Sequence, residues 1–218
     1  HDGKYIQGSA AIISHLDEEF GNLMAALEAS GERENTIVVF TADHGISIGQ
    51  HGLMGKQNLY EHSTRIPMIL AGPGIPENQR VDDRIFHYGL MPTLLESLEL
   101  PIPESVTGES FVPNLQGEGN GLDELYLAYL HSIRGLIQGD WKLLEYRGEE
   151  GYTATQLFNI TEDPLETVDR ASDPDYRQQV ASMRKHLVEL KDSTGDTGVE
   201  WGVRFWQYWE EAEIDLSH

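Results

Sequence analysis

Cysteine is absent from the 218-residue sequence. Without thiols, the chain cannot form a disulfide bond, a zinc–thiolate site or a cysteine nucleophile. Basic residues are scarce too: 15 Lys and Arg stand against 37 Asp and Glu, giving a formal net charge of −22. Such a surface repels nucleic acids and anionic membranes, so neither is expected as a partner. It would also repel an anionic substrate unless a metal ion or a local cationic pocket reverses the field.

Long hydrophobic runs are also missing. No apolar run approaches the roughly 20 residues that a membrane-spanning helix needs. No signal-peptide pattern follows His1, and because a mature or excised chain begins in this way, the sequence indicates no cellular compartment. Hydrophobic residues still make up 39% of the chain and aromatic residues 9%, as in globular proteins. The length allows one domain, or a larger and a smaller lobe.

The first half of the sequence alternates between helical and strand-like patterns. Apolar residues recur at three- and four-residue steps over residues 9–30, which predicts a helix that ends at Gly31. The short apolar runs 36–41 and 66–71 predict strands buried on both faces, and 91–98 predicts another helix. This alternation predicts an α/β fold with a mainly parallel sheet and flanking helices.

The pattern changes in the second half. Four short segments separated by polar turns predict a small antiparallel sheet, and residues 174–190 predict a helix that packs with it. We expect the tail with Trp201, Trp206 and Trp209 to dock as a short helix. The predicted strands are residues 125–130, 133–138, 141–146 and 155–158.

Side chains suited to metal and anion binding follow the first predicted strand. Asp43 offers a carboxylate and His44 an imidazole. His51 and Lys56 lie on the glycine-rich loop that follows, and a lysine ammonium suits a sulfate or phosphate oxygen. Together they could hold an anionic ester between a metal and an ammonium group, where charge on its oxygens is stabilised. Taken alone, Asp-His-Gly after a strand favours a simple turn in which the aspartate caps the next segment.

Short motifs stand in a fixed order along most of the chain. Residues 35–74 contain T-A-D-H-G, G-Q-H-G, G-K, Y-E and R-I-P in that order. Further motifs are M-P-T-L-L at 91–95, W-K-L at 141–143, L-F-N at 157–159 and D-P-L-E at 163–166. This set resembles the sulfatase family of the alkaline-phosphatase superfamily, up to about residue 191. The resemblance implies that residues 1–122 are the C-terminal part of the catalytic α/β domain and 123–218 a small C-terminal α+β subdomain.

The resemblance also implies residue roles. Asp43 and His44 would bind a divalent metal, usually calcium in this family, Lys56 would contact the sulfate and the leaving oxygen, and His51 would lie near the substrate. The family's nucleophile is a formylglycine made from Cys or Ser in a C/S-x-P/A-x-R motif, which this chain lacks. We therefore expect the nucleophile and two further aspartate ligands in a missing N-terminal part.

Two departures and several neighbouring residues limit these assignments. The metal pair is Asp-His rather than Asp-Asn, and since imidazole suits softer metals such as zinc, the metal is left open. Gly89 stands where the family often has Asp. Tyr60 and Glu61 are expected to pack the loop rather than to catalyse, and Asp163-Pro164 to form a turn.

Three functions follow as hypotheses. The first is a sulfuric ester hydrolase such as an arylsulfatase, with a sulfate ester as substrate. The second is a phosphonate monoester or phosphodiester hydrolase on the same scaffold. The third is that the chain alone is an inactive fragment or an interaction module. Because an incomplete sheet exposes strand edges and apolar surface, we expect the chain to self-associate or to need its N-terminal half.

Overall fold

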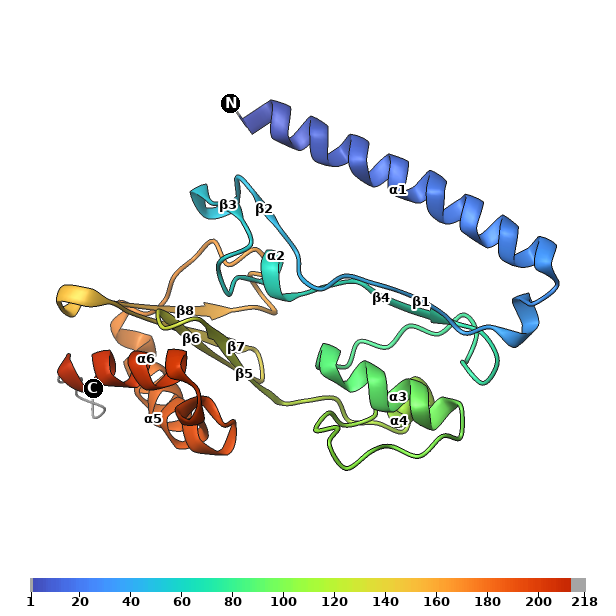
Figure 1. The fold of residues 1–218 in the computed structure, drawn as a ribbon. Helices are drawn as coiled ribbons and strands as arrows, with labels where there is room; N and C mark the ends of the chain where they lie inside the picture. Colours follow the sequence, from blue (N-terminus) through green and yellow to red (C-terminus); the bar gives the residue numbers. More distant parts are fainter. Residues whose placement is uncertain (1, 213–218) are drawn as a thin grey trace. The chain divides into compact units, whose positions relative to one another are not determined.

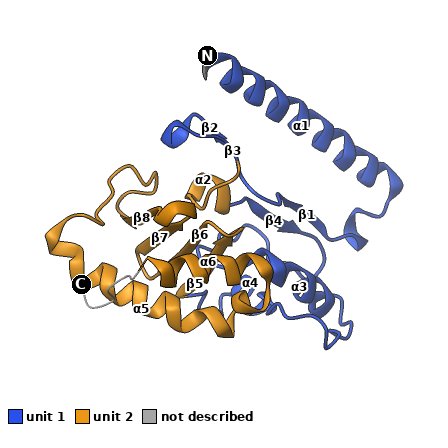
Figure 2. Ribbon diagram, turned by 60° about the vertical axis from the view of Figure 1, so that its left-hand side comes forward, with its two compact units in different colours: residues 1–55, 66–122 blue, residues 56–65, 123–218 orange. Residues whose placement is uncertain are grey.

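The structure is a computed structural model that describes residues 2–212 (Figure 1). It divides into two compact units (Figure 2). Unit 1 comprises residues 1–55 and 66–122, and unit 2 comprises residues 56–65 and 123–218. The short segment 56–65 therefore belongs with the C-terminal part of the chain. No helix in the described residues is long and apolar enough to cross a membrane.

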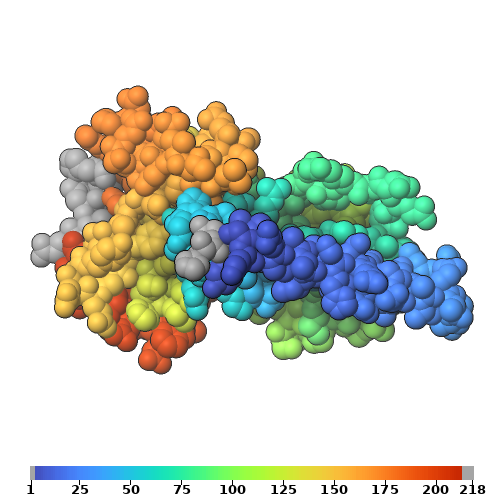
Figure 3. Space-filling view, turned by 90° about the horizontal axis from the view of Figure 1, so that it is seen from above, coloured from blue at the N-terminus to red at the C-terminus, as the bar shows by residue number. Residues whose placement is uncertain are grey.

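Unit 1 begins with the long helix α1 (Asp2–Ser30), which starts earlier than predicted and ends at Gly31. Gly31 has a φ of 76°, a conformation that glycine adopts without strain at the end of a helix. Phe20 packs edge-on against Phe40, with 5.5 Å between the ring centroids. Most other apolar side chains of α1 are exposed, including Ile12 at 71%, and α1 lies on the outside of unit 1 (Figure 3). The described residues therefore leave an apolar face of this helix uncovered.

Strand β1 (Val38–Thr41) pairs with β4 (Met68–Ala71), and the pairing is antiparallel. The prediction of a mainly parallel sheet is therefore wrong for these two strands, although both exist where the sequence places them. The predicted burial of both faces is not seen either, because the residues of β1 are half-buried and Ile69 of β4 is 60% exposed. The physical reason is that a short apolar run indicates a strand but does not fix the direction of its partner. A second, two-stranded antiparallel sheet joins β2 (Ser47–Ile48) to β3 (Met54–Gly55).

The rest of unit 1 contains α3 (Leu90–Ser97), in the predicted place, and the short α4 (Val112–Leu115). Thr93 joins the two helices: its buried hydroxyl donates to the Gly89 carbonyl at 2.7 Å and accepts from the Phe111 amide at 2.9 Å. Pro92 lies in the first turn of α3, where its missing N–H costs nothing.

Unit 2 is built on the predicted antiparallel meander of four strands. One face carries α5 (Arg177–Ser193) and α6 (Glu200–Glu211), which bury Leu143 of the sheet with Leu187, Trp206 and others in one core. Because neighbouring strand residues face opposite sides, Leu144 lies on the other face, in a second core with Leu59 and Tyr60. The segment 56–65, with α2 (Glu61–Thr64), therefore covers the second face. The strands are β5 (Glu124–Tyr129), β6 (Ile133–Gln138), β7 (Trp141–Arg147) and β8 (Thr153–Asn159).

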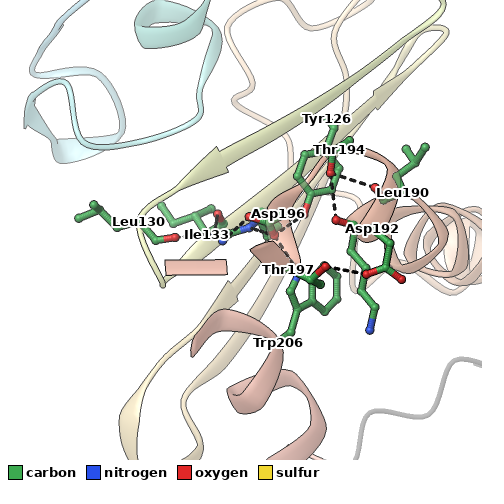
Figure 4. Close-up of polar contacts among 11 residues, drawn as sticks. Tyr126, Leu130, Ile133, Leu190, Asp192, Thr194, Asp196, Thr197 and Trp206 are labelled. Atoms are coloured by element: carbon green, nitrogen blue, oxygen red, sulfur yellow. Dashed lines mark hydrogen bonds and ion pairs between the residues drawn. The ribbon is translucent and has the colours of Figure 1, made fainter. Parts of the chain in front are cut away.

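A buried ion pair fixes the two helices to this sheet. The Arg134 guanidinium donates two hydrogen bonds to the Asp196 carboxylate, at 2.7 and 2.9 Å. Tyr126 and Trp206 donate to the same carboxylate (Figure 4). Burial alone would raise the pKa of Asp196, but these hydrogen bonds outweigh it and hold the pKa below its ordinary value. At Gly202 a Cβ would lie 1.8 Å from the Asp196 carbonyl oxygen, so α6 can approach only at a glycine.

Candidate metal and sulfate site

Asp43 and His44 follow β1 directly, as predicted, and their side chains lie together. Oδ1 of Asp43 accepts a hydrogen bond from the His44 amide at 2.9 Å, and Oδ2 lies 3.2 Å from His44 Nε2. Nδ1 of His44 lies 2.9 Å from the Gly45 carbonyl oxygen. Because a carbonyl oxygen only accepts, Nδ1 is the donor of this contact, and Nε2 is the ring nitrogen that lies beside Asp43.

This pair fits a shared cation. Two ligands at right angles, each about 2.1–2.4 Å from a metal ion, lie about 3 Å apart, close to the separation of Nε2 and Oδ2. A carbonyl bonded to the other ring nitrogen is the usual way to orient a histidine ligand. Asp43 is 81% exposed, so the carboxylate is accessible. Within residues 2–212 no group of three or more potential ligands forms, so these two residues could supply only part of a coordination sphere.

His51 lies on the hairpin between β2 and β3. It occupies the short 3-10 turn Gln50–Gly52, with a positive φ of 53°. The flanking glycines also have positive φ, and the Gly49 amide donates to the Leu53 carbonyl at 3.0 Å to close the hairpin. The G-Q-H-G motif thus forms a tight turn that presents an exposed imidazole on the same unit as Asp43.

Lys56 belongs to unit 2, although it directly follows Gly55, the last residue of β3 in unit 1. Its side chain is exposed, and its carbonyl oxygen accepts from the Asn58 amide at 2.9 Å. Since Asp43, His44 and His51 lie in unit 1, the action of all four residues on one substrate stays a prediction.

Sequence reasoning missed the residues that hold the segment after Lys56. Lys142 is completely buried on β7, where its ammonium meets Glu61 and Glu166. Tyr60 and Glu61 are packing and hydrogen-bonding groups, as predicted, but their partners lie far along the chain. The available signal was Lys142 itself, because a lysine within an apolar strand is almost never buried without a carboxylate partner.

Unit 2 also has a hollow of about 400 Å³ beside β7 and β8. Its polar groups already stabilise the turn after β8: Asn159 Oδ1 accepts from the amides of Thr161 and Glu162, and Asp163 accepts from Thr167 and Val168. This confirms the turn predicted at Asp163. We therefore assign the hollow to the packing of that turn, and it carries no function here.

Comparison with known proteins identifies the family. The model of the Sulfatase family matches residues 4–100. An arylsulfatase of Clostridium perfringens is 31% identical over 188 residues, covering 81% of this chain and 38% of that protein. A sulfatase of Formosa agariphila is 28% identical over 195 residues, covering 88% of this chain and 37% of that protein. The chain thus spans less than two fifths of these relatives.

Solved structures give the same picture. A structure described as a complex with its substrate D-glucosamine-2-N,6-O-disulfate is similar with a TM-score of 0.73 and 25% identity, covering 87% of this chain and 40% of that chain. The phosphonate monoester hydrolase of Agrobacterium radiobacter has a TM-score of 0.71 at 21% identity, covering 83% and 40%, which shows the fold alone. With the ordered motifs, the Asp43–His44 pair and these matches in agreement, the chain belongs to the sulfatase family.

Proposed function

We propose that this chain is the C-terminal part of a sulfuric ester hydrolase. The observation that carries the proposal is the pair of Asp43 and His44 at the end of β1, with donor atoms 3.2 Å apart, inside the stretch that matches the sulfatase family. A surface of net charge −22 repels sulfate esters, and a divalent cation at this pair would reverse that field locally.

Each residue has a proposed role. Asp43 and His44 would hold a divalent metal, with calcium as the expected ion, and that metal would supply Lewis-acid polarisation of a sulfate oxygen. The Lys56 ammonium neutralises charge on the sulfate and on the leaving oxygen. His51 would lie near the substrate. The nucleophile, a formylglycine, and the remaining ligands are proposed to come from residues that this sequence does not contain, so the chain alone is expected to be inactive.

The proposed substrates are sulfate monoesters of aryl groups or sugars. The relative from Clostridium perfringens is named an arylsulfatase, and a similar relative from Bacteroides thetaiotaomicron is named N-acetylglucosamine-6-O-sulfatase. The phosphonate monoester hydrolase alternative rests on likeness of fold alone.

The test uses the full-length protein that contains this chain, with formylglycine content verified and metal supplied. An aryl sulfate, glucosamine-6-sulfate and an aryl phosphonate monoester are offered in parallel. We expect sulfate release from the first or second substrate at a higher kcat/KM than phosphonate cleavage. Turnover of the phosphonate alone would establish the alternative, and no turnover of any ester would contradict the proposal.

A further inference from the structure

The segment after Lys56 is anchored on the sheet of unit 2. Tyr60 is buried, its ring packs edge-on against Phe158 at 6.0 Å between centroids, and its hydroxyl donates to Gln156 Oε1 at 2.7 Å. The Tyr146 hydroxyl donates to the same oxygen at 3.0 Å. Gln156 thus accepts hydrogen bonds from two tyrosine hydroxyls, Tyr60 of the segment and Tyr146 of the sheet. These contacts fix the position of the Tyr60 side chain on the sheet.

A buried charge cluster fixes the next residue. Lys142 Nζ lies 3.0 Å from Glu61 Oε1 and 2.9 Å from Glu166 Oε1. Glu166 also accepts a hydrogen bond from the Glu61 amide, at 2.6 Å. Since Lys142 and Glu166 are almost completely buried, water cannot replace either partner. The cluster therefore holds both the backbone and the side chain of Glu61.

Glu166 is held in an unusual conformation to make these contacts. It has a positive φ of 55°, which costs strain for a residue other than glycine. The turn before it maintains this conformation, because the Glu166 amide donates to the Asp163 carbonyl at 3.0 Å. Strain of this kind persists where the surrounding structure requires one direction for a side chain. Here the required direction brings one carboxylate to both Lys142 and the Glu61 amide.

The anchor reaches Lys56 through two hydrogen bonds. The Tyr60 amide donates to Asn58 Oδ1 at 3.1 Å, and the Asn58 amide donates to the Lys56 carbonyl at 2.9 Å. Asn58 is itself buried. The backbone of Lys56 therefore follows the position of Tyr60 and Glu61 rather than moving as a free loop.

We propose that Lys142 and Glu166 are positioning residues that place the ammonium group of Lys56 for its contact with the sulfate ester. The inference rests on the proposed function. A buried ion cluster contributes little stability over well-packed apolar residues, so its role is better explained by the geometry that it imposes. An error of about 1 Å in a contacting group can lower turnover about 100-fold.

The experiment is a double-mutant cycle in the full-length protein. Glu166→Gln and Lys142→Met are each made alone and together with Lys56→Ala, and kcat and KM are measured with a sulfate ester. The matched control is Asp196→Asn, which makes the same carboxylate-to-amide change in a buried ion pair that does not contact residues 56–65. We expect Glu166→Gln to lower kcat/KM about 10- to 100-fold when Lys56 is present and less than about twofold when it is absent.

The outcomes distinguish an effect that acts through Lys56 from a general loss of stability. Asp196→Asn is expected to change kcat/KM by the same factor in both backgrounds. If Glu166→Gln does the same, or has no effect, Lys142 and Glu166 do not act through Lys56 and the proposal is overturned.

Failure of the proposed function would be visible separately, as an inactive wild-type protein. Amide hydrogen exchange then provides the remaining readout. Glu166→Gln should accelerate exchange at residues 58, 60 and 61, whereas Asp196→Asn should not, and unchanged exchange at these amides in Glu166→Gln would refute the anchoring.

Discussion

Unit 1 and unit 2 differ in what their apolar side chains contact. Among the described residues, Phe111 is the single large hydrophobic residue of unit 1 that is buried, whereas unit 2 buries Leu136, Leu143, Leu157 and many others. Three of the four candidate site residues lie in the sparsely packed unit. Reactive groups and packing are therefore separated along this chain, and substitutions in the two units should have different consequences.

The largest effect should come from Asp43. Replacing it with Ala removes a proposed metal ligand, so we expect kcat/KM of the full-length protein to fall about 1000-fold and bound metal to be lost. Because the side chain is 81% exposed, the free energy of unfolding should change by less than about 0.5 kcal/mol. Metal analysis and steady-state kinetics measure the first effect, and urea titration the second.

The matched control is Asp82→Ala, which removes an exposed carboxylate of the same unit that pairs with Arg80. It should leave metal content and turnover unchanged. Equal losses in both variants would refute the assignment of Asp43.

Unit 2 should show the opposite behaviour at Asp196. Changing Asp196 to Ala leaves the Arg134 guanidinium buried without its carboxylate. We therefore expect the free energy of unfolding to fall by about 3–5 kcal/mol. Urea denaturation of the 218-residue chain, followed by tryptophan fluorescence from α6, measures this change. Arg80→Ala breaks an exposed pair instead and should change stability by less than about 1 kcal/mol.

The exposed face of α1 should make the chain associate. We expect the wild-type chain to sediment above its 24.5 kDa monomer mass, and the double change Ile13→Glu and Leu16→Glu to return it toward that mass. Ser14→Glu adds charge at an exposed polar position and serves as the control. A wild-type chain that sediments as a monomer at every concentration would contradict this prediction.

The smallest effect should come from pH. A hydrogen bond with Glu124 raises the pKa of His186, with a further contribution from Glu189. The stabilisation is therefore complete below the unfolded pKa, about 6.5, and is lost as pH rises through the higher folded value. The pair is partly exposed, so the gain is below about 1 kcal/mol. The difference in free energy of unfolding between wild type and His186→Gln should be larger at pH 5.5 than at pH 8.5. An equal difference at both pH values would disprove the stabilisation by protonated His186.

The sequence allowed the local elements to be predicted. The helix of α1 and the four strands of unit 2 follow from the spacing of apolar residues. The tail docks as a helix through Trp206 and Trp209, as expected, whereas Trp201 is 47% exposed. The antiparallel pairing of β1 with β4 could not be predicted, because a short apolar run has the same composition whichever way its partner strand runs.

The same limit applies to the site. Asp43 and His44 were singled out because they follow a strand within an ordered set of motifs. The structure places their side chains side by side, and their role as metal ligands stays a prediction. The cluster of Lys142, Glu61 and Glu166 was missed, because Lys142 lies 81 positions from Glu61, and Glu61 lies 105 positions from Glu166. No local pattern encodes such pairs, and the allocation of residues 56–65 to unit 2 depends on them.

The membership of residues 56–65 in unit 2 has a consequence for the folding of the chain during its synthesis. A ribosome adds about 5–20 residues per second from the N-terminus, so about 5–20 s pass between the synthesis of Glu61 and that of Glu166. During that interval the peptide carrying Lys56 has no cluster to join, because its carboxylate partner lies 105 residues later in the chain. Lys56, the proposed sulfate contact, would thus be anchored only after Glu166 has been made, and a nascent chain that stops before residue 166 would lack this anchor.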